Sequence, residues 1–325
     1  MGKAGAVLRR SIFSFLQSYQ YFTSTPALLA FPFAVSTLLS QSIGASSSLF
    51  PSVHGRMSSL FLAAGFPPSS VLFTVLGLKL SQTILTFLFV CPFTFSFLLL
   101  AKASVIKAVG HHKPAEQPSF SSWIPLFSPL LITQLCNSLV ILAANATCFF
   151  LLVMFFNLFD VLGLSSPQSQ LLLSATGAVI YSIILANAYI TCNLALVSAG
   201  MEKRGGFISI LKACILIQGR TATALSLAVP INMALAATEV LFQYRVVSAY
   251  HRAKAPDSTM LLEGMLVAYL YSLLVVLDTV VACAFWRSCK TDIQTDQEET
   301  YTHRIEIREI DGKFFAKTEA FNGLP

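Results

Sequence analysis

The chain has 325 residues, of which 55% are hydrophobic and only 11% are charged, whereas charged residues make up about a quarter of an ordinary soluble protein. This composition excludes a globular protein whose whole surface faces water. The formal net charge of +6 comes from Lys and Arg spread along the sequence, which argues against a nucleic-acid-binding protein because such proteins gather their cations on one face.

Six apolar stretches are each long enough to cross a membrane as a helix, which takes about 20 residues for a hydrocarbon core of about 30 Å. They are residues 21–40, 71–101, 129–158, 168–200, 221–244 and 260–286. The predicted fold class is therefore all-α: a polytopic, multi-pass bundle of six transmembrane helices. We expect a cytosolic amphipathic segment at 1–20, one membrane domain at 21–286 and a cytosolic tail at 287–325.

Lys and Arg are distributed unevenly between the two ends of the predicted spans. Sixteen fall at the end that holds both termini, including Lys102 in the loop after the second span, and Lys79 lies inside that span. The opposite end has four, which are Arg56, Arg245, Arg252 and Lys254. Because cationic loops tend to remain in the cytosol, we expect both termini to be cytosolic.

Amphipathic stretches precede the first, third and fifth spans, at residues 8–19, 120–127 and 207–217. Each has apolar residues at helical spacing, and the first and third have cations beside them, a pattern typical of helices lying in the headgroup layer. The alternative is that each stretch continues the next span. Pro125 and Pro129 argue against a continuous helix in the second stretch, and Gly219-Arg220 predicts a break after the third. The three stretches, each with two spans, suggest a threefold organisation.

Three ionisable residues lie within predicted spans, namely Lys79, Glu239 and Asp278. A charge at bilayer depth costs at least about 2.5–3.5 kcal/mol, so each needs a partner or water. Lys79 and Glu239 lie at comparable depth, and we hypothesise that they form an ion pair. Asp278 is nearer the cytosolic end, where water, a hydroxyl or an amide is the expected partner. Either these groups line a polar path, or they tie helices together while Lys79 extends to the interface.

Six asparagines also lie within the predicted spans, where an amide side chain typically forms interhelical hydrogen bonds worth about 0.6–2 kcal/mol. They are Asn137, Asn145, Asn157, Asn187, Asn193 and Asn232. We expect them to hold neighbouring helices together.

The seven cysteines lie in spans or on the predicted cytosolic side, so a disulfide framework is not expected. Cys283 and Cys289 flank Trp286-Arg287 at the inner interface and are candidates for S-palmitoylation; the alternative is that they are small buried residues. The spacing of Cys and His predicts no metal site and no cofactor, and no cluster of catalytic residues is evident.

The tail changes character after Lys290. Ile305, Ile307 and Ile310 precede Asp311-Gly312, and Phe314 and Phe315 follow it. Asp-Gly between two short apolar runs is a strong local hairpin signal, so we predict a small hairpin near 303–318, with a partly disordered tail as the alternative. An isolated hairpin is marginally stable in water and would need to dock on the membrane domain or on a cytosolic protein.

Residues 187–198, which begin Asn187-Ala188-Tyr189, and residues 207–221, which end Gly219-Arg220-Thr221, resemble a plant family of six-span membrane proteins without an assigned activity. The likeness covers roughly 70–290 in layout. More remotely, the layout is similar to the non-catalytic membrane domain of bacterial glycerophosphodiester phosphodiesterases. These resemblances imply architecture and a plant source, and they supply no catalytic residue.

Three classes of function remain. A membrane scaffold or trafficking protein accounts for the amphipathic helices and the tail, and we rank it first. A channel or transporter would use the intramembrane charges, whereas a lipid-modifying enzyme would need a residue cluster that the sequence lacks, so we predict that the protein is not an enzyme. The expected partners are the lipid bilayer of the endomembrane system or plasma membrane and a cytosolic protein bound by the tail, with no nucleic acid. Nothing in the sequence predicts the oligomeric state.

Overall fold

The computed structural model describes residues 2–46, 49–63, 71–110, 124–161, 167–253 and 258–322, and within these ranges it is helical with no strand. The elements, in chain order, are α1 (Gly2–Gln17), α2 (Tyr19–Ser46), α3 (Phe50–Ala63), α4 (Val71–Phe93), the π-helix η1 (Thr94–Leu98), α5 (Leu99–Gly110), α6 (Ile124–Val161), α7 (Pro167–Glu202), α8 (Phe207–Ile217), α9 (Thr221–Phe242), the π-helix η3 (Gln243–Val247), α10 (Ser248–Ala253) and α11 (Ser258–Asn322). The predicted all-α fold class is confirmed.

Six helical segments of the described chain are long and apolar enough to cross a membrane. They are Tyr19–Ser40, Leu80–Gly110, Pro125–Leu151, Ala175–Glu202, Thr221–Tyr250 and Ser258–Asp292. Each overlaps one predicted span, which confirms the prediction of six. The second segment extends nine residues further than expected, from 101 to Gly110, because α4, η1 and α5 continue one another. This extension brings Lys102 into the bundle.

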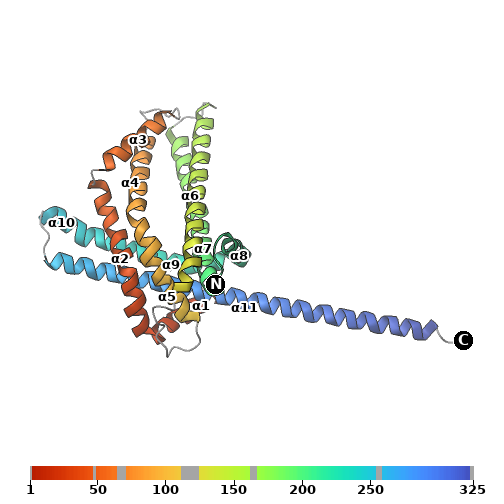
Figure 1. The fold of residues 1–325 in the computed structure, drawn as a ribbon. Helices are drawn as coiled ribbons and strands as arrows, with labels where there is room; N and C mark the ends of the chain where they lie inside the picture. Colours follow the sequence, from red (N-terminus) through yellow and green to blue (C-terminus); the bar gives the residue numbers. More distant parts are fainter. Residues whose placement is uncertain are drawn as a thin grey trace.

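The helices are arranged as hairpins that meet at one end. α6 and α7 run side by side, and α9 and the first part of α11 form a second pair that crosses them (Figure 1). α2 packs against α4, α5 and α11, and the Tyr269 hydroxyl of α11 donates a hydrogen bond to the Thr23 carbonyl of α2 at 2.9 Å. α11 also packs against α1, α5, α7, α8 and α9.

The largest apolar core lies where the hairpins meet, and we call this region the packed half (residues 99–110, 124–137, 190–217, 224–231 and 275–292). Its fully buried members include Leu99, Leu130, Leu196 and Cys283. The outer part of the α6–α7 hairpin (residues 138–161 and 167–189), here named the α6–α7 arm, exposes large apolar side chains such as Leu142 and Leu172, which are 66% and 70% exposed. Such surfaces suit contact with lipid.

α6 begins at Ile124 and continues through Pro129, so the predicted break in the second amphipathic stretch is wrong for residues 124–129; residues 120–123 lie outside the described chain. Pro125 lies in the first turn, where a helix needs no N–H donor. The Thr133 hydroxyl donates to the Pro129 carbonyl at 2.7 Å and accepts from the Gly206 N–H at 2.9 Å. The connection from α7 to α8 is thereby held against α6.

α8 is a separate helix, as the Gly219-Arg220 break predicts. Gly206 and Gly219 flank it with φ of 90° and 79°, a left-handed conformation that favours glycine. Ile210, Ala213 and Ile217 of α8 are buried in the packed half, whereas its opposite face is exposed and apolar, with Phe207, Ile208, Leu211 and Ile215. α1 likewise exposes Phe13 and Leu16 together with Arg9 and Arg10. That these faces lie in the headgroup layer stays a prediction.

α11 is one helix of 65 residues that leaves the bundle and continues toward the C-terminus (Figure 1). The predicted hairpin at 303–318 is therefore wrong, since these residues lie within the helix. No proline occurs between Ser258 and Asn322 to interrupt it, and Ile307, Ile310 and Phe314 also fit helical spacing, so the Asp-Gly signal competes with a pattern that extends the helix.

Candidate functional site

A chain of three polar side chains joins three helices inside the packed half. The Lys102 ammonium of α5 donates a hydrogen bond to Asn193 Oδ1 of α7 at 2.9 Å, and Asn193 Nδ2 donates to Asp278 Oδ2 of α11, also at 2.9 Å. The amide thus stands between a cation and a carboxylate, with its acceptor toward Lys102 and its donor toward Asp278. This arrangement can relay hydrogen bonding between α5 and α11 through α7.

Each member of the polar chain is itself half-buried and follows or precedes buried residues in its helix. Lys102 is flanked by Ala101 and Ala103, which are 2% and 0% exposed, and Cys192 and Thr279 beside the other two members are also buried. Charges at this depth require partners because hydrocarbon provides no hydrogen bonds. Lys102 and Asp278 compensate each other through the Asn193 amide, and the region carries no net formal charge from these three groups.

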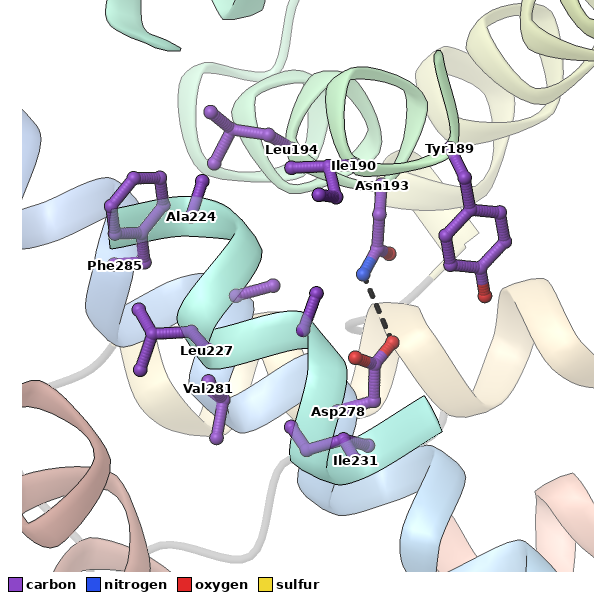
Figure 2. Close-up of a pocket in the computed structure, with 12 residues that line it drawn as sticks. Tyr189, Ile190, Asn193, Leu194, Ala224, Leu227, Ile231, Asp278, Val281 and Phe285 are labelled. Atoms are coloured by element: carbon purple, nitrogen blue, oxygen red, sulfur yellow. Dashed lines mark hydrogen bonds between the residues drawn. The ribbon is translucent and has the colours of Figure 1, made fainter. Parts of the chain in front are cut away.

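A small cavity adjoins the polar chain between α7, α9 and α11 (Figure 2). Its volume of about 40 Å³ exceeds the roughly 10–15 Å³ that one water molecule needs. Tyr189, Asn193 and Asp278 provide its polar lining. The rest of the wall is apolar and consists of Ile190, Leu194, Ala224, Leu227, Ala228, Ile231, Val281, Ala282 and Phe285. The polar groups lie at one side of an otherwise hydrophobic space.

Of the residues singled out from the sequence, Asp278 belongs to this site, and of its expected partners (water, a hydroxyl or an amide) the structure shows an amide, that of Asn193. The sequence analysis missed Lys102 because it counted that residue in a loop. A signal was present, since Leu99, Leu100 and Ala101 precede Lys102 and Ala103, Val105 and Ile106 follow close behind. An apolar run that continues beyond a single Lys is compatible with a buried cation at the end of a span.

Glu239 lies apart from the polar chain, on α9. Its Oε1 accepts a hydrogen bond from the Tyr271 hydroxyl of α11, in the sixth span, at 3.2 Å. The side chain of Lys79 lies outside the described residues, and the hypothesised Lys79–Glu239 ion pair stays a prediction. Glu239 contributes to the packing of α9 on α11.

The asparagines of the spans divide into two groups. Asn137 of α6 donates to the Cys192 carbonyl of α7 at 2.8 Å, and Asn145 of α6 accepts from the Tyr181 hydroxyl of α7 at 2.5 Å. These two and Asn193 confirm the prediction of interhelical bonds. Asn187 and Asn232 instead donate to carbonyls of their own helices. The side chain of Asn157 lies outside the described residues.

Cys283 and Cys289 are buried, with 0% and 1% of their surface exposed. A thiol must reach solvent or the interface to accept a palmitoyl group, so this packing favours the alternative in which both are small buried residues. Cys214 on α8 is the cysteine that the described chain exposes. Palmitoylation at Cys283 or Cys289 therefore has no support from the geometry.

Polar contacts also close the packed half at the ends of α8, α9 and α11. Arg220, just before α9, lies 3.3 Å from Asp292 and donates to the Cys289 carbonyl at 3.2 Å. Arg287 donates to the Val109 carbonyl of α5, and Lys212 of α8 pairs with Glu202 at the end of α7. These contacts join α9 to α11, α11 to α5, and α8 to α7.

The chemistry available at the site is hydrogen bonding and charge compensation. Within the described residues no group of three or more His, Cys, Asp or Glu side chains lies close enough to hold a metal ion.

Fold and site together define a polytopic helical membrane protein with half-buried charges that are hydrogen-bonded within its packed half. The model of the family described as a domain of unknown function (DUF8558) matches residues 4–301. The chain belongs to this family. No curated protein and no solved structure matches it. The resemblance to plant six-span proteins stays a prediction.

Proposed function

We propose that this protein is a membrane scaffold or trafficking adaptor that binds a cytosolic protein through the extension of α11. The observation that carries the proposal is the continuation of α11 from Asp292, the end of its span, to Asn322. At 1.5 Å per residue this extension is about 45 Å long. A solvated helix gains little stability from its own backbone, so a bound partner is its natural source of stability.

The packed half supports the same proposal. Lys102 and Asp278 inside it are hydrogen-bonded to Asn193, and the largest apolar core lies in the same region. An interior of this kind holds a fixed framework, which is what a scaffold needs. The proposed orientation puts both termini in the cytosol: with Lys102 removed from the loops, the count of Lys and Arg is still fifteen to four. The proposed location is the endomembrane system or plasma membrane.

The test compares the full chain with a chain that ends at Gln294, which keeps the Arg220–Asp292 contact and removes the extension. Proximity labelling from the N-terminus in cells should detect a set of cytosolic proteins with the full chain. The truncated chain should reach the same membrane at the same level and lose these proteins. Equal labelling by both chains would contradict the proposal.

Transport of an ion or small solute is the second candidate, favoured by the cavity beside Asp278. Reconstituted vesicles loaded with a panel of ions and solutes test it directly. Flux that depends on the protein and disappears in Asp278→Asn, while the variant keeps its elution profile, would replace the scaffold proposal. The scaffold proposal expects leakage no greater than in protein-free vesicles.

A further inference from the structure

The cavity between α7, α9 and α11 contains two polar atoms that the protein itself leaves available. Asp278 uses Oδ2 for Asn193, and its other carboxylate oxygen accepts no hydrogen bond from the described residues. The Tyr189 hydroxyl also has no hydrogen-bond partner among them. Both residues line the cavity, and Figure 2 shows Tyr189 and Asn193 extending from α7 toward the side of the cavity where Asp278 stands. The cavity therefore offers a ligand one hydrogen-bond acceptor, the second oxygen of Asp278, and one hydroxyl that can donate or accept, that of Tyr189.

The cavity reaches the outer surface of the bundle at Tyr189, which lines it and is 45% exposed. Asp278 is about 21 Å along α11 from Asp292 at 1.5 Å per residue, which is deep within the span Ser258–Asp292. A molecule that enters at this depth comes from the bilayer and carries apolar surface.

The charge at the polar end determines which head group fits. The Asp278 carboxylate is already compensated by the Lys102 ammonium through Asn193, so an added cation would leave one positive charge uncompensated in a low-dielectric interior. An anion would face the carboxylate directly. A neutral hydroxyl avoids both costs, because it donates to the free oxygen of Asp278 and accepts from Tyr189.

We propose that this cavity binds a membrane lipid whose polar head is a single hydroxyl group. The hydroxyl bonds to Asp278 and Tyr189, and the adjoining apolar part of the lipid contacts Leu227, Ile231 and Val281. The cavity volume of about 40 Å³ accommodates the head and the first carbons, and the remainder of the molecule extends past Tyr189 among the bilayer lipids. Sterols and diacylglycerols share this chemistry.

The experiment uses the full chain in phosphatidylcholine vesicles with three photoactivatable, alkyne-tagged probes: a sterol, a diacylglycerol and a phosphatidylcholine. We expect saturable labelling by the sterol or by the diacylglycerol, competed by the same lipid without the tag, on peptides that contain Tyr189 or Ile231. The two probes tell which lipid alcohol binds. The phosphatidylcholine probe should label without saturation.

Three variants locate the site. Ala228→Phe fills the cavity from α9 and should abolish saturable labelling, whereas Ala237→Phe adds the same side chain at an exposed position of the same helix and should leave it unchanged. Tyr189→Phe removes one hydroxyl and should weaken binding about 3- to 20-fold, the range expected for one hydrogen bond within a membrane. Elution profile and yield verify that each variant folds.

Saturable labelling that is equal in Ala228→Phe and Ala237→Phe would overturn the proposal, as would saturable labelling confined to another surface or saturable labelling by phosphatidylcholine. If Ala228→Phe fails to fold, Tyr189→Phe decides the question, because an unchanged affinity in this conservative variant excludes the proposed hydrogen bond. Failure of all three probes to label saturably also overturns it. None of these outcomes depends on the function of the α11 extension.

Discussion

The packed half and the α6–α7 arm are built from equally apolar sequence and reach different structures. In the packed half, Leu130 and Leu196 of α6 and α7 are fully buried against other helices. In the α6–α7 arm, Leu142 and Leu172 of the same two helices are exposed. The difference lies in the polar contacts between helices in the packed half, since lipid is as apolar as leucine and gives no hydrophobic reason for helices to associate.

Polar contacts in the packed half join helices that are far apart in the sequence. Lys102 and Asn193 are 91 residues apart, and Asn193 and Asp278 are 85 apart. In the α6–α7 arm the described hydrogen bond between helices is that of Tyr181 to Asn145, within one hairpin. The comparison indicates that the packed half is the stable unit of the fold and that the arm adds a lipid-facing surface.

The largest expected effect comes from breaking the polar chain. Lys102→Met leaves the half-buried Asp278 carboxylate without its compensating cation and should lower the free energy of unfolding by about 3–5 kcal/mol, the range for breaking a desolvated pair. In the double variant Lys102→Met/Asp278→Leu no charge remains uncompensated, and the loss should fall to about 1–3 kcal/mol for the unpaired Asn193 amide. SDS unfolding in mixed micelles measures both.

Arg9→Met, at an exposed position of α1, is the control for removing a cation from this end of the molecule and should be nearly neutral. If the loss in the double variant equalled the sum of the losses in Lys102→Met and in Asp278→Leu alone, Lys102 and Asp278 would be energetically independent. The polar chain would then not explain why the packed half holds together.

Gly205→Ala should have the next largest effect. A Cβ atom at Gly205 would lie 2.4 Å from the Pro129 carbonyl oxygen, and backbone cannot yield as a side chain can, so we expect a loss of about 1–3 kcal/mol. Gly55→Ala in α3 is the matched control, because nothing lies within 4 Å of its new Cβ and alanine favours the helix. An unchanged stability of Gly205→Ala would show that the α7–α8 connection can move away from α6.

A smaller effect distinguishes the two groups of asparagines. Asn137 is 2% exposed, and Asn137→Ala removes its hydrogen bond between α6 and α7. This change should lower the free energy of unfolding by about 0.6–2 kcal/mol. Asn232→Ala removes a bond within α9 at an exposed position and should be neutral or stabilising in the same SDS titration. Equal losses of stability in the two variants would mean that a hydrogen bond between helices stabilises the protein no more than one within a helix.

The sequence predicted the six spans because long apolar runs are a local property. It left water, a hydroxyl and an amide as possible partners of Asp278 and did not identify Asn193, since nothing local relates positions 85 residues apart. Lys102 was misplaced because a lysine near the end of an apolar run looks like the start of a loop. The hairpin at 303–318 failed for the opposite reason: a strong local turn signal, Asp311-Gly312, lies inside a longer helix.

The smallest expected effect is at the edge of the packed half. Asp292→Ala removes the contact of 3.3 Å with Arg220, and because both side chains are partly exposed, the pair should contribute only about 0.2–1 kcal/mol. Arg220 retains its bond to the Cys289 carbonyl, which limits the loss further. The loss of stability in Asp292→Ala should shrink as salt is raised toward 1 M, where charges are screened within about 3 Å. The loss in Lys102→Met should persist, because the Asp278 carboxylate lies within the packed half. A salt-independent loss in Asp292→Ala would place Asp292 within the packed half and not at its edge.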